Sequence, residues 1–183
     1  MHSRLARHDD VPALRKLIEE SVTQLQTGFL DAAQIASSRA TMGVDTQLID
    51  DGTYFVVEID GEIAGCGGWS RRATLYGGNH SKGRDSRLLD PATEPAKVRA
   101  MFTHPAFARR GVGRLILSLA EEAARAEGFT ALELMASLSG MPLYERAGFV
   151  PGERIEDANG GAPVPLVRMH KKLAQTLTAP GGS

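Results

Sequence analysis

The stretch that decides the fold is V-R-A-M-F-T-H-P-A-F-A-R-R-G-V-G-R-L-I-L-S-L-A-E-E-A-A-R-A-E-G, residues 98–128. Its beginning, Val98–Thr103, is rich in β-branched, aromatic and apolar side chains, which is typical of a buried strand. Pro105 and Gly111 then punctuate the chain, and apolar residues recur at helical spacing from Gly113 to Glu127. The stretch therefore predicts a strand, a turn and a helix, in that order.

The predicted helix is amphipathic and has a clear end. Gly128 stands where a glycine commonly follows the last helical residue. Glu121 and Arg125 are four residues apart in the order that favours an ion pair. The apolar face is predicted to consist of Leu115, Ile116, Leu119, Ala120 and Ala123.

The turn before this helix predicts an anion site. The first turn of a helix leaves backbone N–H groups unpaired, and the helix dipole adds partial positive charge there. Gly111 and Gly113 lack the Cβ atom that would keep a phosphate away from the backbone. Pyrophosphate is the ligand that such a turn would bind. The alternative is an ordinary turn between a strand and a helix, with arginines exposed to solvent. The choice of pyrophosphate rests on the three arginines around the turn, which are Arg109, Arg110 and Arg114.

Two common nucleotide-binding loops are absent from the sequence. Residues 105–113 contain no G-x-x-x-x-G-K-S/T, so a Walker-type loop is excluded there. The stretch also lacks G-x-G-x-x-G followed by an acidic residue about 20 positions later, which argues against a dinucleotide fold.

Length and composition predict one domain over residues 1–173, followed by a polar tail, 174–183, that we expect to be frayed. The net charge of −1 gives no general attraction to nucleic acid or to an anionic membrane. Cys66 is the single cysteine, so an internal disulfide is excluded. With no signal peptide and no apolar run of about 20 residues, we expect a cytoplasmic protein with no membrane or nucleic-acid partner.

The whole chain predicts an α+β fold, a mixed and mostly antiparallel sheet of about seven strands flanked by about four helices in the order βααβββαβαββ. Asp60-Gly61 between two β-prone runs is a strong hairpin signal. The long segment 72–95 is expected to be a lid, a binding loop or a mobile loop. Strands are predicted at 4–7, 53–59, 62–71, 98–103, 130–136, 149–155 and 164–172, and helices at 9–23, 31–42, 113–127 and 140–146.

Two blocks of this sequence resemble motifs of the GNAT superfamily of acetyl-CoA-dependent N-acetyltransferases. The block M-F-T-H-P-A-F-A-R-R-G-V-G-R (101–114) resembles the family's fourth strand and its pyrophosphate loop, Q/R-x-x-G-x-G/A. Gly111 and Gly113 match this loop, whereas Ala108 stands at the Q/R position. The change removes one polar side chain but leaves the backbone donors in place.

The second block, S-L-S-G-M-P-L-Y-E-R-A-G-F (137–149), is similar to the family pattern N-x-x-A-x-x-x-Y-x-x-x-G-F. Tyr144, Gly148 and Phe149 match, whereas Ser137 replaces the usual asparagine and Gly140 the usual alanine. The serine puts one side-chain contact to the cosubstrate in doubt.

The resemblance implies that the strands ending near Thr103 and Ala136 splay apart and receive pantetheine like an added strand. Acetyl-CoA is then the cosubstrate, no metal is needed, and the acceptor is a small-molecule or peptide amine. The residues implied to bind the cosubstrate are Met101, Phe102, Thr103, Ala108, Arg109, Arg110, Gly111, Val112, Gly113, Arg114, Ser137 and Tyr144.

The resemblance also implies direct attack of the amine on the thioester, with a backbone N–H at Met101 or Phe102 as the oxyanion donor. Tyr144 is the predicted general acid for the leaving thiolate, because a phenol pKa of about 10 lies just above a thiol pKa of about 8.5. The alternative is that Tyr144 only packs its ring in the core. Four residues are weak candidates for a general base, beside the alternative that no dedicated base exists: His104, His80, Glu94 and Glu20.

The acceptor pocket has few diagnostic residues. Cys66 is expected to be a small core residue rather than a nucleophile. Trp69 and Tyr76 are candidates to line the pocket, although Trp69 would serve equally as core. Basic residues cluster between positions 71 and 87, and such clusters commonly form a solvated face. If this one lined the mouth of the acceptor pocket, it would favour an acidic acceptor. The cluster consists of Arg71, Arg72, Lys82, Arg84 and Arg87.

Two other functions stay open at the level of sequence. A non-catalytic acyl-CoA-binding module would share the loop but have no acceptor cleft, and the departures at Ala108 and Ser137 keep this hypothesis in play. An enzyme that uses another phosphate-bearing cofactor at the same turn is the third hypothesis. Exposed terminal strands would also suit a homodimer.

Overall fold

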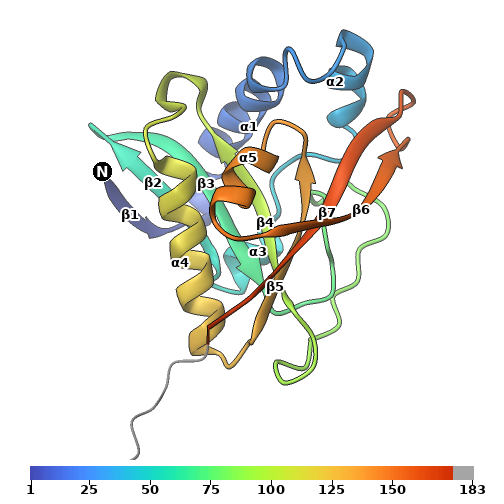
Figure 1. The fold of residues 1–183 in the computed structure, drawn as a ribbon. Coiled ribbons are helices and arrows are strands. Elements are labelled where there is room, and N and C mark those ends of the chain that lie inside the picture. The colour runs from blue at the N-terminus through green and yellow to red at the C-terminus, as the bar shows by residue number, and fades with distance from the viewer. Residues whose placement is uncertain (175–183) are drawn as a thin grey trace, which may run out of the picture.

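The computed structural model describes residues 1–174, which form one seven-stranded sheet with helices on both faces (Figure 1). The strand order across the sheet is β1-β2-β3-β4-β5-β7-β6. The strands are β1 (His2–Leu5), β2 (Tyr54–Ile59), β3 (Glu62–Ser70), β4 (Ala96–Thr103), β5 (Ala131–Ser137), β6 (Val150–Asp157) and β7 (Val164–Lys172). The α-helices are α1 (Val11–Leu25), α2 (Ala32–Ser38), α3 (Thr46–Asp50), α4 (Val112–Ala126) and α5 (Met141–Arg146), and the 3₁₀ turns are η1 (His8–Asp10) and η2 (Pro105–Phe107).

The sheet is mixed and mostly antiparallel, as the sequence predicts. The β4–β5 pair is parallel, and the other neighbouring strands of the sheet run antiparallel. The helix α4 connects β4 to β5, which is the crossover that a parallel pair requires. The predicted tail lies outside the described residues from residue 175 onward.

The core has a layer on each face of the sheet, because successive strand residues point to opposite faces. On one face α4 packs with Val57 and Ala64. On the other face α1 and α3 pack with Val56 and Cys66. Figure 1 shows α4 crossing the sheet, while α1 and α2 lie near the ends of the strands at the top of the view.

Several predicted boundaries are wrong by a few residues. The helix α3 was not predicted, because it is only five residues long and the cap that begins it, Asp45, is a single local signal. The strand β1 begins at His2 because it pairs with β2 as far as Glu58. The helix α2 ends at Ser38, four residues early, and Gly111 is the N-cap of α4, so that helix begins at Val112.

The predicted apolar face of α4 is rotated relative to the buried one. Leu115, Leu119 and Ala123 are only partly buried. The helix packs on the sheet mainly through a row of residues four apart, since such residues lie above one another on one side of a helix. The buried residues are Val112, Ile116, Leu117, Ala120 and Ala124.

The glycines of β3 allow α4 to lie close to the sheet. A Cβ atom at Gly65 would collide with Val112, and one at Gly67 would lie 2.9 Å from Cγ2 of Ile116. Side chains at these positions would therefore push the helix away from the sheet. The low side-chain bulk of this strand thus sets the position of α4.

A β-bulge interrupts β4 in its middle. Arg99 pairs with Gly68 and Phe102 with Cys66, so two residues of β4 oppose one residue of β3. Ala100 has a φ of 50°, in the left-handed region that non-glycine residues rarely adopt. The Tyr54 hydroxyl donates a 2.9 Å hydrogen bond to the Ala100 carbonyl and holds the bulge in place.

The two edge strands of the sheet are β1 and β6. A homodimer stays a prediction. Within residues 1–174, no helix combines the length and the apolar composition that a membrane span requires.

Three charged side chains connect β4, β5 and β7 near the end of the sheet. Glu133 of β5 forms ion pairs with Lys97 of β4 and with Arg168 of β7, the latter at 2.6 Å. Burial by itself would raise the pKa of Glu133, but hydrogen bonds from Lys97 and Arg168 outweigh burial and hold the pKa below its ordinary value. The Lys97 side chain is nearly buried, so its charge depends on this partner.

Glu133→Gln should lower the free energy of unfolding by about 2 kcal/mol at neutral pH, because it leaves a nearly buried lysine without a countercharge. A carboxyl whose pKa falls on folding stabilises the protein above its unfolded pKa, and this contribution is lost as the pH falls through the folded pKa. The difference between wild type and variant should therefore shrink below about pH 4. Urea unfolding at several pH values measures it.

The matched control for this prediction is Glu122→Gln, at an exposed position of α4. It should change stability by less than about 0.5 kcal/mol at every pH. A Glu133→Gln penalty that is absent at neutral pH, or that grows in acid, would contradict the role given to the charge cluster.

Candidate functional site

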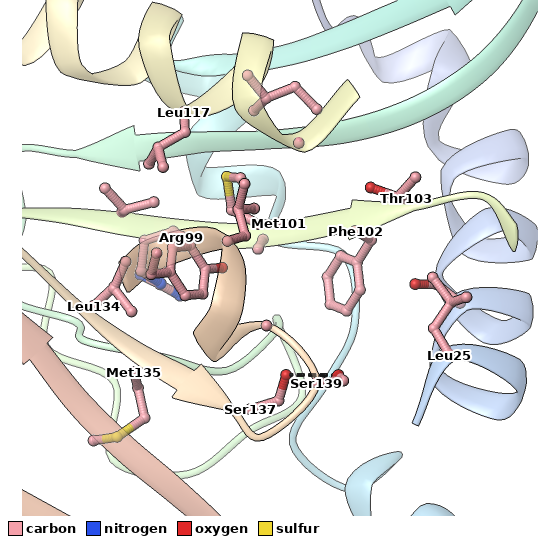
Figure 2. A pocket seen from close by; sticks show the side chains of 18 of the residues that line it. Leu25, Arg99, Met101, Phe102, Thr103, Leu117, Leu134, Met135, Ser137 and Ser139 are labelled. Atoms are coloured by element: carbon pink, nitrogen blue, oxygen red, sulfur yellow. Dashed lines mark hydrogen bonds between the residues drawn. The ribbon is translucent and has the colours of Figure 1, made fainter. Parts of the chain in front are cut away.

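The central feature of the site is the divergence of β4 and β5. The two strands pair only at Ala96↔Leu132 and Lys97↔Glu133. β4 nevertheless continues to Thr103 and β5 to Ser137. Beyond the second pair, the facing edges of both strands have backbone groups without a strand partner, which need a partner of another kind. Figure 2 shows Met101 and Thr103 on one side of the opening and Ser137 on the other.

A cavity of about 1070 Å³ occupies this opening and continues on both sides of the sheet. Its walls come from the outer half of β4, the end of β5, the first turn of α4, the helix α5 and the end of α1. Eleven of the twelve residues that the sequence predicts to bind the cosubstrate line the cavity. They are Met101, Phe102, Thr103, Ala108, Arg109, Gly111, Val112, Gly113, Arg114, Ser137 and Tyr144.

The start of α4 presents a row of backbone donors to the cavity. Within the described residues, the N–H groups of residues 109–114 donate to no protein acceptor, and no side chain caps the helix. Arg109 and Gly111 have φ values of 62° and 85°, so the chain turns through left-handed conformations just before the helix. Such turns form concave groups of N–H donors that bind anions. This turn is therefore the candidate phosphate site.

The arginines of the turn are not equivalent. Arg109 and Arg114 line the cavity. Arg110 does not, and its guanidinium instead lies 5.3 Å over the ring of Phe107. Ala108 lines the cavity, but its own N–H donates to the Pro105 carbonyl and is not free for a ligand. Two arginines and the helix start therefore supply the positive potential.

Tyr144 lies on α5 with its ring in the core and its side chain at the cavity wall. The ring meets Phe149 edge-on at 5.9 Å, so the packing role considered from the sequence is present. The hydroxyl donates to no protein acceptor in the described part of the chain, and burial raises the pKa of Tyr144 to about 12. A Cβ atom at Gly140 would lie 3.0 Å from the ring, so this glycine makes room for the tyrosine. Tyr144 can therefore pack its ring in the core and still offer its hydroxyl to a ligand.

Ser137 stands at the end of β5 and lines the cavity. Its hydroxyl lies 3.2 Å from that of Ser139, as the dashed line in Figure 2 marks. A hydroxyl of this pair can turn toward a ligand, although it reaches less far than an asparagine amide would.

None of the four candidate bases lines the cavity. His104 and Glu20 pair with each other at 2.8 Å, and Nδ1 of His104 accepts the Ala106 N–H, so the histidine is held at the end of β4. His80 binds the Arg39 carbonyl at 2.9 Å. Glu94 pairs with Arg87, whose hydrogen bonds lower the pKa of Glu94 to about 2.

Two other candidates behave as core residues. Cys66 borders the cavity but is fully buried, and burial raises the pKa of its thiol to about 12, the opposite of what a nucleophile needs. Trp69 does not line the cavity and instead packs edge-on against Phe129 at 5.8 Å. Tyr76, by contrast, lines the cavity on the α1 side.

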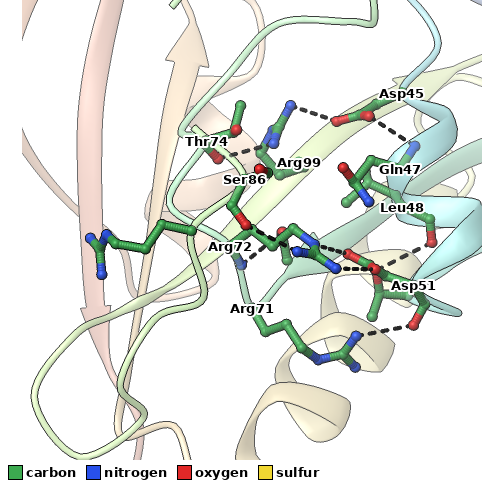
Figure 3. Close-up of polar contacts among 12 residues, drawn as sticks. Asp45, Gln47, Leu48, Asp51, Arg71, Arg72, Thr74, Ser86 and Arg99 are labelled. Atoms are coloured by element: carbon green, nitrogen blue, oxygen red, sulfur yellow. Dashed lines mark hydrogen bonds and ion pairs between the residues drawn. The ribbon is translucent and has the colours of Figure 1, made fainter. Parts of the chain in front are cut away.

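The basic cluster proposed from the sequence is largely paired. Arg71 binds Glu127, Arg72 binds Asp51, and neither lines the cavity. Figure 3 shows the Arg72–Asp51 pair. The pairs of Arg84 with Asp45 and of Arg87 with Glu94 continue the pattern, and Lys82 is exposed.

The cationic residue on the α1 side of the cavity is Arg99, which was not predicted as a site residue from the sequence. The sequence did contain a sign of this residue, because Arg99 stands inside an otherwise apolar strand pattern. Charged residues are rarely buried unless they are paired or functional.

Comparison with known proteins agrees with this geometry. The sequence model described as "Acetyltransferase (GNAT) family" matches residues 15–149. No curated protein matches the sequence significantly.

Many solved structures share the fold. A GCN5-related N-acetyltransferase from Rhodopseudomonas palustris is 17% identical, with a TM-score of 0.70 over 94% of this chain and 95% of that one. The putative acetyltransferase yncA from Salmonella typhimurium, solved with acetyl-CoA, is 19% identical, with a TM-score of 0.62 over 100% and 99%. The ribosomal-protein-S18-alanine N-acetyltransferase from Escherichia coli is 13% identical, with a TM-score of 0.57 over 97% and 96%. At these identities the likeness concerns the fold.

The buried thiol allows a direct test. Iodoacetamide should label native Cys66 at pH 7.5 far more slowly than the same protein unfolded in guanidinium chloride, because the thiol is inaccessible and protonated. Mass spectrometry of timed samples measures the rate, and Cys66→Ala, which has no thiol, gives the background. Labelling of the native protein at the unfolded rate would show that the thiol is accessible.

Proposed function

This chain belongs to the acetyltransferase (GNAT) family, and on that basis we propose that it transfers the acetyl group of acetyl-CoA to a primary amine. One observation carries the proposal. The opening between β4 and β5 joins the free donors at the start of α4 to the Tyr144 hydroxyl within a single cavity. Phosphate recognition and acid catalysis are thus available to one extended molecule.

The chain's own groups fit the parts of acetyl-CoA. The unpaired N–H groups of residues 109–114, with Arg109 and Arg114, suit a pyrophosphate. Pantetheine has amides along an extended chain, so it can pair with the free edges of the diverging strands. The similarity in fold to yncA, solved with acetyl-CoA, supports this assignment.

The oxyanion donor can be narrowed to one of the two predicted residues. His104 donates its N–H to the Ala64 carbonyl, toward β3. Along the regular part of the strand, alternate N–H groups point to the same side, so the Phe102 N–H also points to β3. Met101, at the bulge, remains as the candidate donor to the opening. We therefore assign the stabilisation of the developing oxyanion to Met101.

Tyr144 is the proposed general acid. Burial moves its pKa to about 12, further above the thiol pKa than expected from the sequence. The phenol is protonated at neutral pH and holds a proton for the thiolate that leaves as the amide forms. None of the candidate bases lines the cavity, so the acceptor is proposed to react through its own neutral fraction.

The shape of the cavity bears on the non-catalytic alternative. A module that only binds acyl-CoA would have no acceptor side. The cavity continues past β4 to Leu25, Phe29 and Tyr76, which leaves room for an acceptor. This observation favours the transferase.

Tyr144→Phe should lower kcat by about 100-fold, because it removes the proton of the leaving group. The affinity for acetyl-CoA should change little, and stability should change by less than about 0.5 kcal/mol, because the hydroxyl makes no protein hydrogen bond. Steady-state kinetics, calorimetry with acetyl-CoA and urea unfolding separate the three effects. An undiminished kcat would remove Tyr144 from the mechanism.

Gly111→Ala tests the phosphate site, with Gly61→Ala as its control. The two glycines have φ values of 85° and 84°, and a Cβ atom at either would meet nothing within 4 Å. Both substitutions should therefore cost about 1 kcal/mol of stability through backbone strain.

Of the two variants, only Gly111→Ala should weaken CoA binding, by about tenfold, because relief of the strain disturbs the N–H groups before α4. Isothermal calorimetry with CoA measures the difference. Equal CoA affinity in the two variants would move the phosphate site away from this turn.

A further inference from the structure

The acceptor side of the cavity is mostly apolar and carries few polar groups. Its apolar walls include Val22, Leu25, Phe29, Met42 and Leu75. Its polar lining residues are Ser21, Gln26, Thr41, Tyr76 and Arg99. An apolar pocket with a few placed polar groups recognises a small molecule through those groups.

Arg99 is the charged group of this lining, and it lies directly before the bulge of β4. Its side chain is 2% exposed. Its Nη2 donates to Asp45 at 2.7 Å and to the Gly77 carbonyl at 2.7 Å, and its Nη1 donates to the Thr74 carbonyl at 3.0 Å. Its Nε has no acceptor in the described part of the chain. Figure 3 shows the guanidinium between Thr74 and Asp45.

The positive charge around Arg99 exceeds the negative charge that it contacts. Asp45 is fully buried and is shared by Arg99 and Arg84, so one carboxylate faces two guanidinium groups. Burial lowers the pKa of Arg99 to about 10, although the group stays protonated at neutral pH. A buried cation without its own countercharge is costly, and an anionic ligand would supply that charge.

A buried carboxylate, that of Asp157, lies behind two residues of this lining, Thr41 and Tyr76. Asp157 accepts a 2.5 Å hydrogen bond from Thr41 and a 2.6 Å bond from Asn159, but it forms no ion pair within the described residues. Burial and the charge of Asp157 raise the pKa of Tyr76, so two lining residues border this carboxylate. The Oε1 atom of Gln26 is also buried and accepts no hydrogen bond. The Gln26 oxygen suits an N–H bond of an amine, and the Asp157 carboxylate behind the lining adds negative potential.

We propose that the acceptor is a free amino acid with an apolar side chain, and that Arg99 selects it by binding its carboxylate. The inference rests on the proposed function and names the acceptor of that same cavity. A polyamine would meet the excess charge of Arg99 and Arg84 without a carboxylate to offer. An amino group on a protein, at its N-terminus or on lysine, has no free carboxylate on the same carbon.

The reaction balances without a further reactant. The amino nitrogen forms a bond to the acetyl carbon, and the bond from that carbon to sulfur breaks. The thiolate takes the phenolic proton of Tyr144. The proton that the amine loses returns through solvent to the tyrosinate, so the products are an N-acetyl amino acid and CoA.

The test is a panel of acceptors with the wild-type enzyme and acetyl-CoA, followed by release of the CoA thiol. The panel holds the common L-amino acids, the amide of each, the amine left by its decarboxylation, and spermidine. We expect apolar amino acids to be acetylated, with kcat/KM about 100-fold higher than for the matching amides, because the amide lacks the carboxylate that Arg99 would bind.

Arg99→Gln and Arg84→Gln form a matched pair of variants, since both arginines bind Asp45 and only Arg99 lines the cavity. Arg99→Gln should reduce the preference for the acid over the amide to about threefold or less. Arg84→Gln should keep the preference, even if it lowers stability equally. A structural role for Arg99 would lower both rates and leave their ratio unchanged, which would overturn its assignment. If Arg99→Gln does not fold, the wild-type ratio still decides whether the acceptor is a free amino acid.

The outcomes also separate this inference from the proposed function. Acetylation of amides or spermidine as fast as of amino acids overturns the inference and keeps the transferase. Acetyl-CoA binding without acetylation of any member of the panel also overturns the inference. Failure to bind acetyl-CoA in calorimetry overturns the proposed function itself.

Discussion

The structure depends on the short pairing between β4 and β5. Two residue pairs join these parallel strands, and the ion pairs of Glu133 with Lys97 and Arg168 hold the sheet together at that point. The bulge at Ala100 then redirects β4, so both strands continue with free edges. A sheet normally avoids unpaired backbone groups in its interior, and here their presence creates the cavity and the need for an extended ligand.

The other elements are arranged around this opening. Glycines in β3 let α4 lie close to the sheet, and the helix begins at the mouth of the cavity with its donors free. Gly140 gives the ring of Tyr144 its place, so the hydroxyl meets the same cavity. On the far side of β4, the carboxylate of Asp45 holds Arg99 under the segment that carries Thr74 and Gly77.

Sequence patterns were most informative where the physical cause is local. The strand, glycine turn and helix of residues 98–128 are each specified by neighbouring residues, and the structure confirms all three. They were least informative about which side of an element is buried and where its side chains point. The buried face of α4 is rotated from the predicted one, and Arg110 turns to Phe107 instead of the cavity, because contacts with distant residues decide which side of an element is covered.

By itself, the sequence determined the order of the strands and of the α-helices other than α3, the mixed sheet and the anion site at the start of α4. Glycine positions and hydrophobic spacing act over a few residues, which is why these features could be predicted. The tertiary structure alone decided which charges remain uncompensated. Four arginines pair with carboxylates up to 56 residues away in the chain: Arg71, Arg72, Arg84 and Arg87. Arg99, by contrast, shares its carboxylate with Arg84 and lines the cavity. Charge compensation depends on distances in space, and the fold sets those distances only when the whole sheet is assembled.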